Sequence, residues 1–143
     1  MNSSKILVGI QFVSIALIMI PKPTIMIVSF WWVFPLLGLG LSLWIFKHNR
    51  LGNFNIVPEI KTDASLVTSG PYRWVRHPMY SALILSIWGV VLWHFCWMNL
   101  LLFTIMIAAV SAKASKEERL WLARDVAYAD YKARSKMLIP FVL

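Results

Sequence analysis

Acidic residues are scarce in this chain, since six Asp and Glu stand against 14 Lys and Arg in 143 residues, for a formal net charge of +8. Charged residues of both signs make up only 14% of the sequence and hydrophobic residues 59%, which is too little polar surface to cover a water-soluble globule. The single cysteine, Cys96, excludes an intramolecular disulfide. The composition therefore predicts an integral membrane protein.

Several functional classes lack the residues they would need. None of the six acids falls in an apolar run, whereas a small transporter usually carries an ionisable residue inside a span. No second histidine or cysteine stands near His77, so no metal site is expected. A Ser-His-Asp triad is not expected, because no nucleophile elbow is present. The basic residues lie at helix ends and form no separate domain, which argues against binding of nucleic acid.

Long apolar runs dominate what is present. A membrane span needs about 20 residues, and about 17 at the short end, so the runs amount to four helices. The prediction is an all-α, polytopic membrane protein that forms a single domain over residues 1–143. The four transmembrane helices are expected at about 5–20, 25–46, 78–95 and 97–115.

The positive charge predicts the orientation. The segment 47–78 holds five Lys and Arg, and the tail from Lys113 onward holds seven, whereas Lys22 alone lies on the opposite side. Positive residues in short loops remain cytoplasmic. Both termini and the middle loop, which includes Lys61, are therefore expected on the cytoplasmic face of the cell inner membrane.

The densest polar chemistry lies in the run SGPYRWVRHPMY, residues 69–80, directly before an apolar segment. A proline disfavours helix in the residue before it and is favoured at a helix start, so His77 should be extended and a helix should begin at Pro78. Residues 51–69 are expected to form a loop with little regular structure. After Ala112 an amphipathic pattern indicates that the last helix continues into the cytoplasm.

These residues resemble a known family. The string LVTSGPYRWVRHPMY, an apolar hairpin, EERL, a Tyr-x-x-Tyr and a terminal LIPF are similar to the isoprenylcysteine carboxyl methyltransferase and phospholipid methyltransferase superfamily, over residues 66–141. The sequence differs from the family pattern at Asp125-Val126, where Phe-Gly is common, and at 98–100, where Asn-Pro is common. Both differences bear on the substrate more than on the cofactor.

The resemblance implies S-adenosylmethionine as methyl donor, bound at the cytoplasmic membrane face between a loop and a C-terminal helical tail. It implies catalytic roles for Arg76 and for Lys113, which occupies the place of a substrate-contacting arginine. A lysine there lacks the planar fork that an arginine offers to a carboxylate. The implied cofactor-binding residues are Leu66, Val67, Tyr72, His77, Pro78, Met79, Tyr80, Glu117 and Glu118.

Alternatives remain beside this interpretation. Glu117 and Glu118 could form a solvated helix face, and Arg76 could anchor lipid phosphates. The G-x-G at 38–40 is more typical of close helix packing than of a binding site. The expected partners are the lipid bilayer and a lipophilic or prenylated acceptor, with isoprenylcysteine carboxyl O-methylation as the first candidate. The others are phospholipid N-methylation, an NADPH-dependent sterol-reductase-like activity, and a non-enzymatic four-helix protein.

Overall fold

The structure is a computed structural model that describes residues 3–23, 25, 29–49, 53, 56–59 and 64–140. Within these ranges the chain is all-helical and contains no β-strand. The α-helical fold class is therefore confirmed for the described part of the chain. The elements are α1 (Ser3–Met19), α2 (Val33–His48), the 3₁₀-helix η2 (Gly70–Arg73), α3 (Pro78–Trp93), α4 (Trp97–Arg124) and α5 (Ala127–Arg134).

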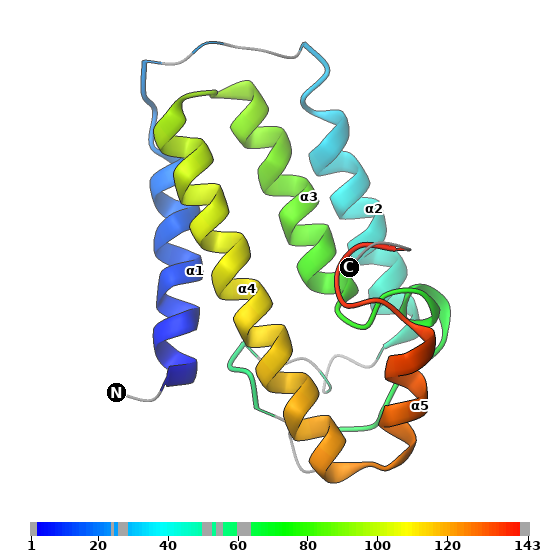
Figure 1. The fold of residues 1–143 in the computed structure, drawn as a ribbon. Coiled ribbons are helices and arrows are strands. Elements are labelled where there is room, and N and C mark those ends of the chain that lie inside the picture. Colours follow the sequence, from blue (N-terminus) through cyan, green and yellow to red (C-terminus); the bar gives the residue numbers. More distant parts are fainter. Residues whose placement is uncertain are drawn as a thin grey trace.

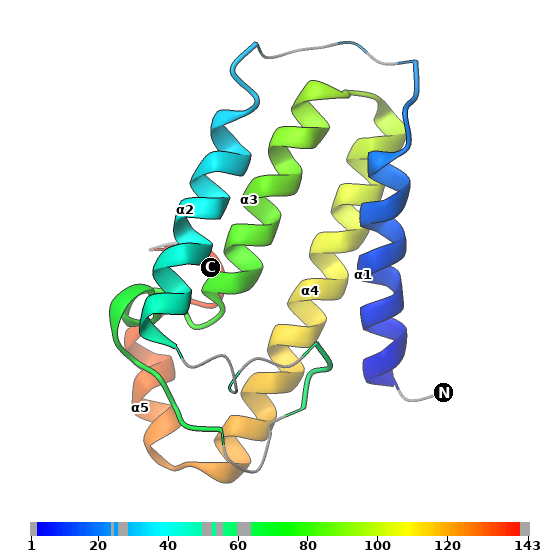
Figure 2. The same ribbon diagram turned by 180° about the vertical axis from the view of Figure 1, so that it is seen from behind.

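Helices α1 to α4 run alternately up and down, and α5 turns back from the end at which α4 finishes (Figure 1). The helices pack mainly as two pairs, α1 with α4 and α2 with α3, and α3 also contacts α4. The view from behind shows the same order, with α3 and α4 between α2 and α1 (Figure 2). The polar segment before α3 and the short helix α5 therefore meet at one end of the bundle.

Among the residues that the structure describes, one helix is long and apolar enough to cross a membrane. Helix α4 has 28 residues and a mean hydropathy of 1.6 over its most apolar stretch. At about 1.5 Å per residue it is about 42 Å long, whereas the hydrocarbon core of a bilayer is about 30 Å thick. The predicted continuation of this helix beyond residue 115 is confirmed. Helices α1, α2 and α3 are apolar but have only 17, 16 and 16 residues, so four spans stay a prediction.

The second helix begins later than expected. The predicted span started at residue 25, but residues 29–32 form turns and α2 begins at Val33. Pro35 explains the position, because proline has no backbone N–H and is favoured in the first turn of a helix. The backbone N–H of Val33 donates to Phe30 O at 3.1 Å, which closes the turn before the helix.

Two apolar clusters hold the bundle together. The larger joins α1, α3 and α4, and the smaller joins α2, η2 and α3 near the polar end. Gly38 allows α2 and α3 to approach closely, because a Cβ there would overlap Ser86 Oγ and Ala82 O, whereas a Cβ at Gly40 would meet open space. The packing interpretation of the G-x-G therefore holds for Gly38. The larger cluster consists of Ile18, Ile87, Val91, Phe103, Met106 and Val110.

Candidate functional site

The backbone between α2 and α3 turns sharply to bring its polar side chains inward. Gly70 has a φ of +59°, a left-handed conformation that favours glycine, and a Cβ there would overlap the ring of His48. Pro71 follows in the first turn of η2. His77 has φ −121° and ψ 59°, so its backbone is not helical, and α3 begins at Pro78 as the sequence predicts. His77 therefore lies at the N-terminal end of α3.

A cleft of about 870 Å³, a volume that includes the solvent space at its open side, lies between this segment, the end of α2 and the C-terminal part of α4. Eight of the nine predicted cofactor-binding residues line it, and Arg76 lines it too. Glu118 and Lys113 do not appear in its wall. The eight are Leu66, Val67, Tyr72, His77, Pro78, Met79, Tyr80 and Glu117.

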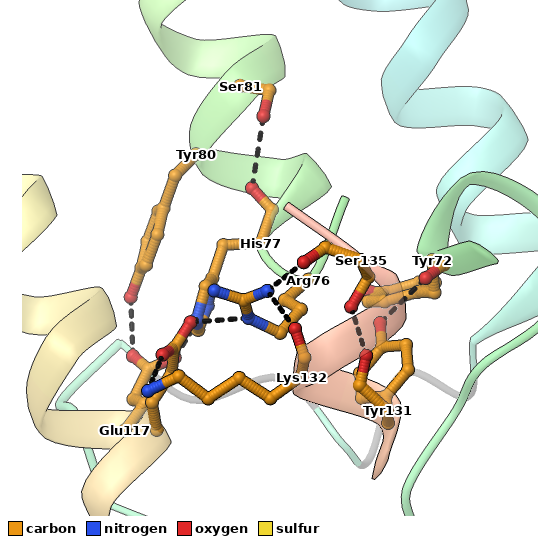
Figure 3. A network of polar contacts seen from close by, with 10 residues as sticks. Tyr72, Arg76, His77, Tyr80, Ser81, Glu117, Tyr131, Lys132 and Ser135 are labelled. Atoms are coloured by element: carbon orange, nitrogen blue, oxygen red, sulfur yellow. Dashed lines mark hydrogen bonds and ion pairs between the residues drawn. The ribbon is translucent and has the colours of Figure 1, made fainter. Parts of the chain in front are cut away.

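Glu117 faces the cleft, where the described residues Tyr80 and His77 contact it (Figure 3). Tyr80 OH donates a hydrogen bond to Glu117 Oε1 at 2.5 Å, and His77 Nδ1 lies 3.3 Å from Glu117 Oε2. The Glu117 side chain remains 20% exposed. A carboxylate has about four lone-pair sites, so this one retains acceptor capacity on the side of the cleft.

His77 is held between the two carboxylates and stacks on Tyr80, with 5.6 Å between the ring centroids. Burial disfavours the imidazolium, but the adjacent Glu117 and Glu118 outweigh burial and raise the pKa of His77 above its ordinary value. Glu118 Oε1 lies 3.5 Å from His77 Nε2, yet this buried nitrogen makes no hydrogen bond to the residues that the structure describes. His77 thus links Glu117, which faces the cleft, with Glu118, which does not line it.

Glu118 does not line the cleft and joins the tail clamp, which we define as Arg76, Glu118, Lys132 and Ser135. Arg76 Nε donates to Glu118 Oε1 at 2.6 Å, and Lys132 Nζ lies 2.8 Å from Glu118 Oε2. The Arg76 Nη1 group donates to the backbone carbonyls of Lys132 and Ser135, at the C-terminal end of α5. A cation there also interacts favourably with the helix dipole.

The segment after α5 is fixed to the base of α3. Arg76 N donates to Lys136 O at 2.8 Å, His77 N donates to Met137 O at 3.1 Å, and Ser81 Oγ donates to Leu138 O. The predicted catalytic residue Arg76 thus lies in the cleft wall, yet the contacts it makes in this part of the chain hold the tail. Its catalytic role stays a prediction.

Lys113 lies one turn before Glu117 but faces α1. Its side chain is buried, its Nζ donates to Gln11 Oε1 at 2.6 Å, and Nζ lies 5.2 Å from the centroid of the Tyr80 ring. Lys113 therefore contacts Tyr80, which lines the cleft, but does not line the cleft itself. Its predicted substrate contact stays a prediction.

Sequence reasoning did not assign several residues that line the cleft. Tyr72 OH accepts from Asn49 Nδ2 at 2.7 Å, and Asn49 Oδ1 accepts from Asn53 Nδ2 at 2.6 Å. Asn49 ends an apolar run, and the sequence alone marks that position only as a helix end. Three aromatic residues of the amphipathic tail also line the cleft and were not assigned to it from the sequence, namely Trp121, Tyr128 and Tyr131.

The tail aromatics are ordered by their own contacts. The rings of Trp121 and Tyr128 stack with centroids 6.0 Å apart, and Tyr131 OH donates to Tyr72 O at 2.7 Å. Burial raises the pKa of both Tyr128 and Tyr131, so their phenols stay protonated at neutral pH. No group of three or more His, Cys, Asp or Glu side chains is placed to hold a metal ion among the described residues.

Comparison with known proteins and families identifies the family to which this chain belongs. A search of curated proteins found no match. The family model described as phospholipid methyltransferase matches residues 31–129, which span α2, the polar segment, α3 and α4 and include both His77 and Glu117. Members of that family are integral membrane methyltransferases that act on lipid and generally use S-adenosylmethionine. Because the match covers well over half of the 143 residues, the chain belongs to the phospholipid methyltransferase family, within the superfamily that its sequence resembles.

Proposed function

We propose that this protein transfers a methyl group from S-adenosylmethionine to a lipophilic acceptor at the membrane surface. The observation that carries the proposal is Glu117, a carboxylate facing the cleft, with Tyr80 OH held at 2.5 Å and His77 at 3.3 Å. The family membership supports the reaction class. Use of this cofactor by this chain and the identity of the acceptor are the proposed part.

The groups in the cleft fit the cofactor. It offers ribose hydroxyls to an acceptor, an adenine ring to aromatic surfaces, and an amino-acid tail to polar donors. Glu117 would accept from the ribose hydroxyls, and the rings of Trp121 and Tyr72 would contact the adenine. His77, whose Nδ1 lies 3.3 Å from Glu117 Oε2, would hold that carboxylate in place beside the bound cofactor.

When bound, the cofactor supplies an electrophilic methyl group, so that a bond forms from the acceptor to that carbon while the carbon–sulfur bond breaks. The protein's part is to hold both reactants in line and to keep water out. The tail clamp would contribute by closing the cytoplasmic side of the cleft against α3. A carboxylate acceptor needs no proton removed, whereas an ammonium acceptor must first lose one.

The first candidate acceptor is the carboxylate of an isoprenylated cysteine, which the sequence resemblance favours. The second is the amine of a phospholipid, and the family match favours it. The position of Lys113 supports the second candidate, because that side chain is only 2% exposed and is hydrogen-bonded to Gln11. Lysine also lacks the bidentate fork that arginine offers to a carboxylate.

We further propose that all four long helices cross the bilayer as one domain, with both termini on the cytoplasmic side. The basic residues support this topology, since Lys5 lies near the start of α1, at the end of the bundle where Lys116 Nζ donates to Ser4 Oγ. Lys22 follows the other end of α1 and donates to Asn99 Oδ1 near the start of α4. Single cysteines replacing Lys5 or Lys22 in a Cys96→Ser background test it. A membrane-impermeant reagent applied to intact cells should label position 22 and leave position 5 unlabelled. The reverse pattern would contradict the topology.

The proposed reaction is tested in two steps on the detergent-purified full chain. Calorimetric titration should show saturable binding of S-adenosylhomocysteine and none of NADPH. Methyl-labelled cofactor is then supplied with a farnesylcysteine analogue or with phosphatidylethanolamine vesicles, and label should enter one of these lipids. Binding of NADPH without binding of S-adenosylhomocysteine would move the protein to a reductase-like class, and binding of neither would indicate a non-enzymatic role.

A further inference from the structure

Helix α1 lies outside the matched region 31–129, yet it has a buried polar face. Ser4, Gln11 and Ser14 are buried, and with Ile18 they recur at helical spacing on the side that packs against α4. A buried amide costs free energy unless it is hydrogen-bonded, most of all in an apolar bundle. This face therefore calls for an explanation beyond apolar packing.

Gln11 connects α1 to the cleft through two further side chains. Its Oε1 accepts a hydrogen bond of 2.6 Å from Lys113 Nζ, and the ammonium lies 5.2 Å from the centroid of the Tyr80 ring. Tyr80 OH in turn donates to Glu117 at 2.5 Å. An unbroken series of contacts thus runs from α1 to the carboxylate that faces the cleft.

The spacing of Lys113 and Glu117 gives Gln11 a specific task. Residues four apart on a helix are neighbours on one face, so a lysine at 113 has Glu117 within reach as an alternative partner. An ammonium paired with Glu117 would compete with any ligand hydroxyl for the same oxygens. In the structure, the Lys113 ammonium instead lies on the α1 side, between Gln11 and the face of Tyr80.

We propose that Gln11 is a positioning residue that keeps Lys113 away from Glu117 and so leaves the carboxylate available to the cofactor. The inference rests on the proposed function, because it assigns Glu117 to cofactor binding. It makes the N-terminal helix a part of the site, although that helix lies outside the region that the family model matches.

The experiment is a double-mutant cycle on affinity for S-adenosylhomocysteine, measured by calorimetry on the full chain. Gln11→Leu should weaken binding about tenfold, the size expected when one charge-assisted contact is misplaced. Gln11→Glu keeps an acceptor for the ammonium and should bind within about threefold of the parent. Ser14→Ala, a matched change on the same buried face, should leave affinity unchanged.

The double variant distinguishes positioning from packing. Once Lys113→Met has removed the ammonium, adding Gln11→Leu should cause no further loss, and this variant also has no unpaired charge that could prevent folding. An equal loss in both backgrounds would overturn the inference, as would parent-like binding by Gln11→Leu. In either case, binding by the parent chain would leave the proposed function standing. No binding by the parent would overturn both.

Discussion

Glu117 and Glu118 are consecutive residues of α4, yet they belong to two different regions of the molecule. The Glu118 side chain is 2% exposed, and Arg76 and Lys132 satisfy its two oxygens within the tail clamp. Glu117 is 20% exposed and faces the cleft. Removing a buried charge whose partners are all protein groups destabilises the fold, whereas a charge left partly open is suited to a ligand.

Of the variants considered, Glu118→Ala should cause the largest loss of stability. Removing one partner of a buried ion pair leaves the others uncompensated, so we expect a loss of about 3–5 kcal/mol of stability. Thermal unfolding in detergent, with the exposed Asp130→Asn as control, measures it. A parent-like melting temperature combined with lost cofactor binding would place Glu118 in the cleft, as the sequence resemblance implies.

Arg76→Lys tests whether the clamp needs an arginine. A lysine ammonium cannot reach Glu118 and two backbone carbonyls in the same planar geometry, and hydrogen bonds to charged groups contribute about 1.5–3 kcal/mol. The melting temperature should therefore fall, with kcat of the remaining folded enzyme nearly unchanged. A lower kcat at unchanged stability would instead support the predicted catalytic role of Arg76.

The pH dependence of stability sharpens the role of the histidine shared by the two regions. The pKa of His77 is raised in the folded protein, so its stabilising contribution is complete below the unfolded value of about 6.5 and is lost as the pH rises through the folded value. Each pKa unit contributes about 1.4 kcal/mol. Between about pH 6 and 9, the melting temperature should fall more steeply with rising pH for the parent than for His77→Asn. Parallel curves would refute this account of His77.

The smallest effect is expected from Ser81→Ala, which removes the hydrogen bond from Ser81 Oγ to Leu138 O. A neutral hydrogen bond contributes about 0.5–1.5 kcal/mol, so the melting temperature should fall slightly. Affinity for S-adenosylhomocysteine should stay the same, because Ser81 does not line the cleft. A change in affinity without a change in stability would mean that the two regions are not separate.

The sequence predicted those features that depend on local rules. The all-helical class follows from the apolar runs, the start of α3 from His77-Pro78, and the length of α4 from the amphipathic pattern after Ala112. The family follows from the order of the polar motifs and is confirmed. Lys61 lies outside the described residues, so the predicted structure of its loop stays a prediction. The predicted orientation in the membrane also stays a prediction.

The division of roles between neighbouring side chains could not be predicted in the same way. Consecutive helical residues differ by about 100° in direction, so the pair at 117 and 118 must face different neighbours, but only the packing of α5 decides which faces the cleft. The contact of Lys113 with Gln11 joins residues 102 positions apart. No local sequence pattern predicts such a contact. For the same reason, the place of Asn49 in the cleft wall could not be predicted from the sequence.

The most direct test of the account is a titration of the full chain and of Glu117→Gln with S-adenosylhomocysteine, alongside Asp130→Asn as a control for the loss of one negative charge. A carboxylate that accepts ribose hydroxyls forms charge-assisted bonds, so Glu117→Gln should bind roughly ten- to a hundredfold more weakly while its melting temperature stays near that of the parent. Asp130→Asn should match the parent in both. An affinity within about twofold of the parent, with a clearly lower melting temperature for Glu117→Gln, would show that Glu117 stabilises the helix bundle and that the cofactor site lies elsewhere.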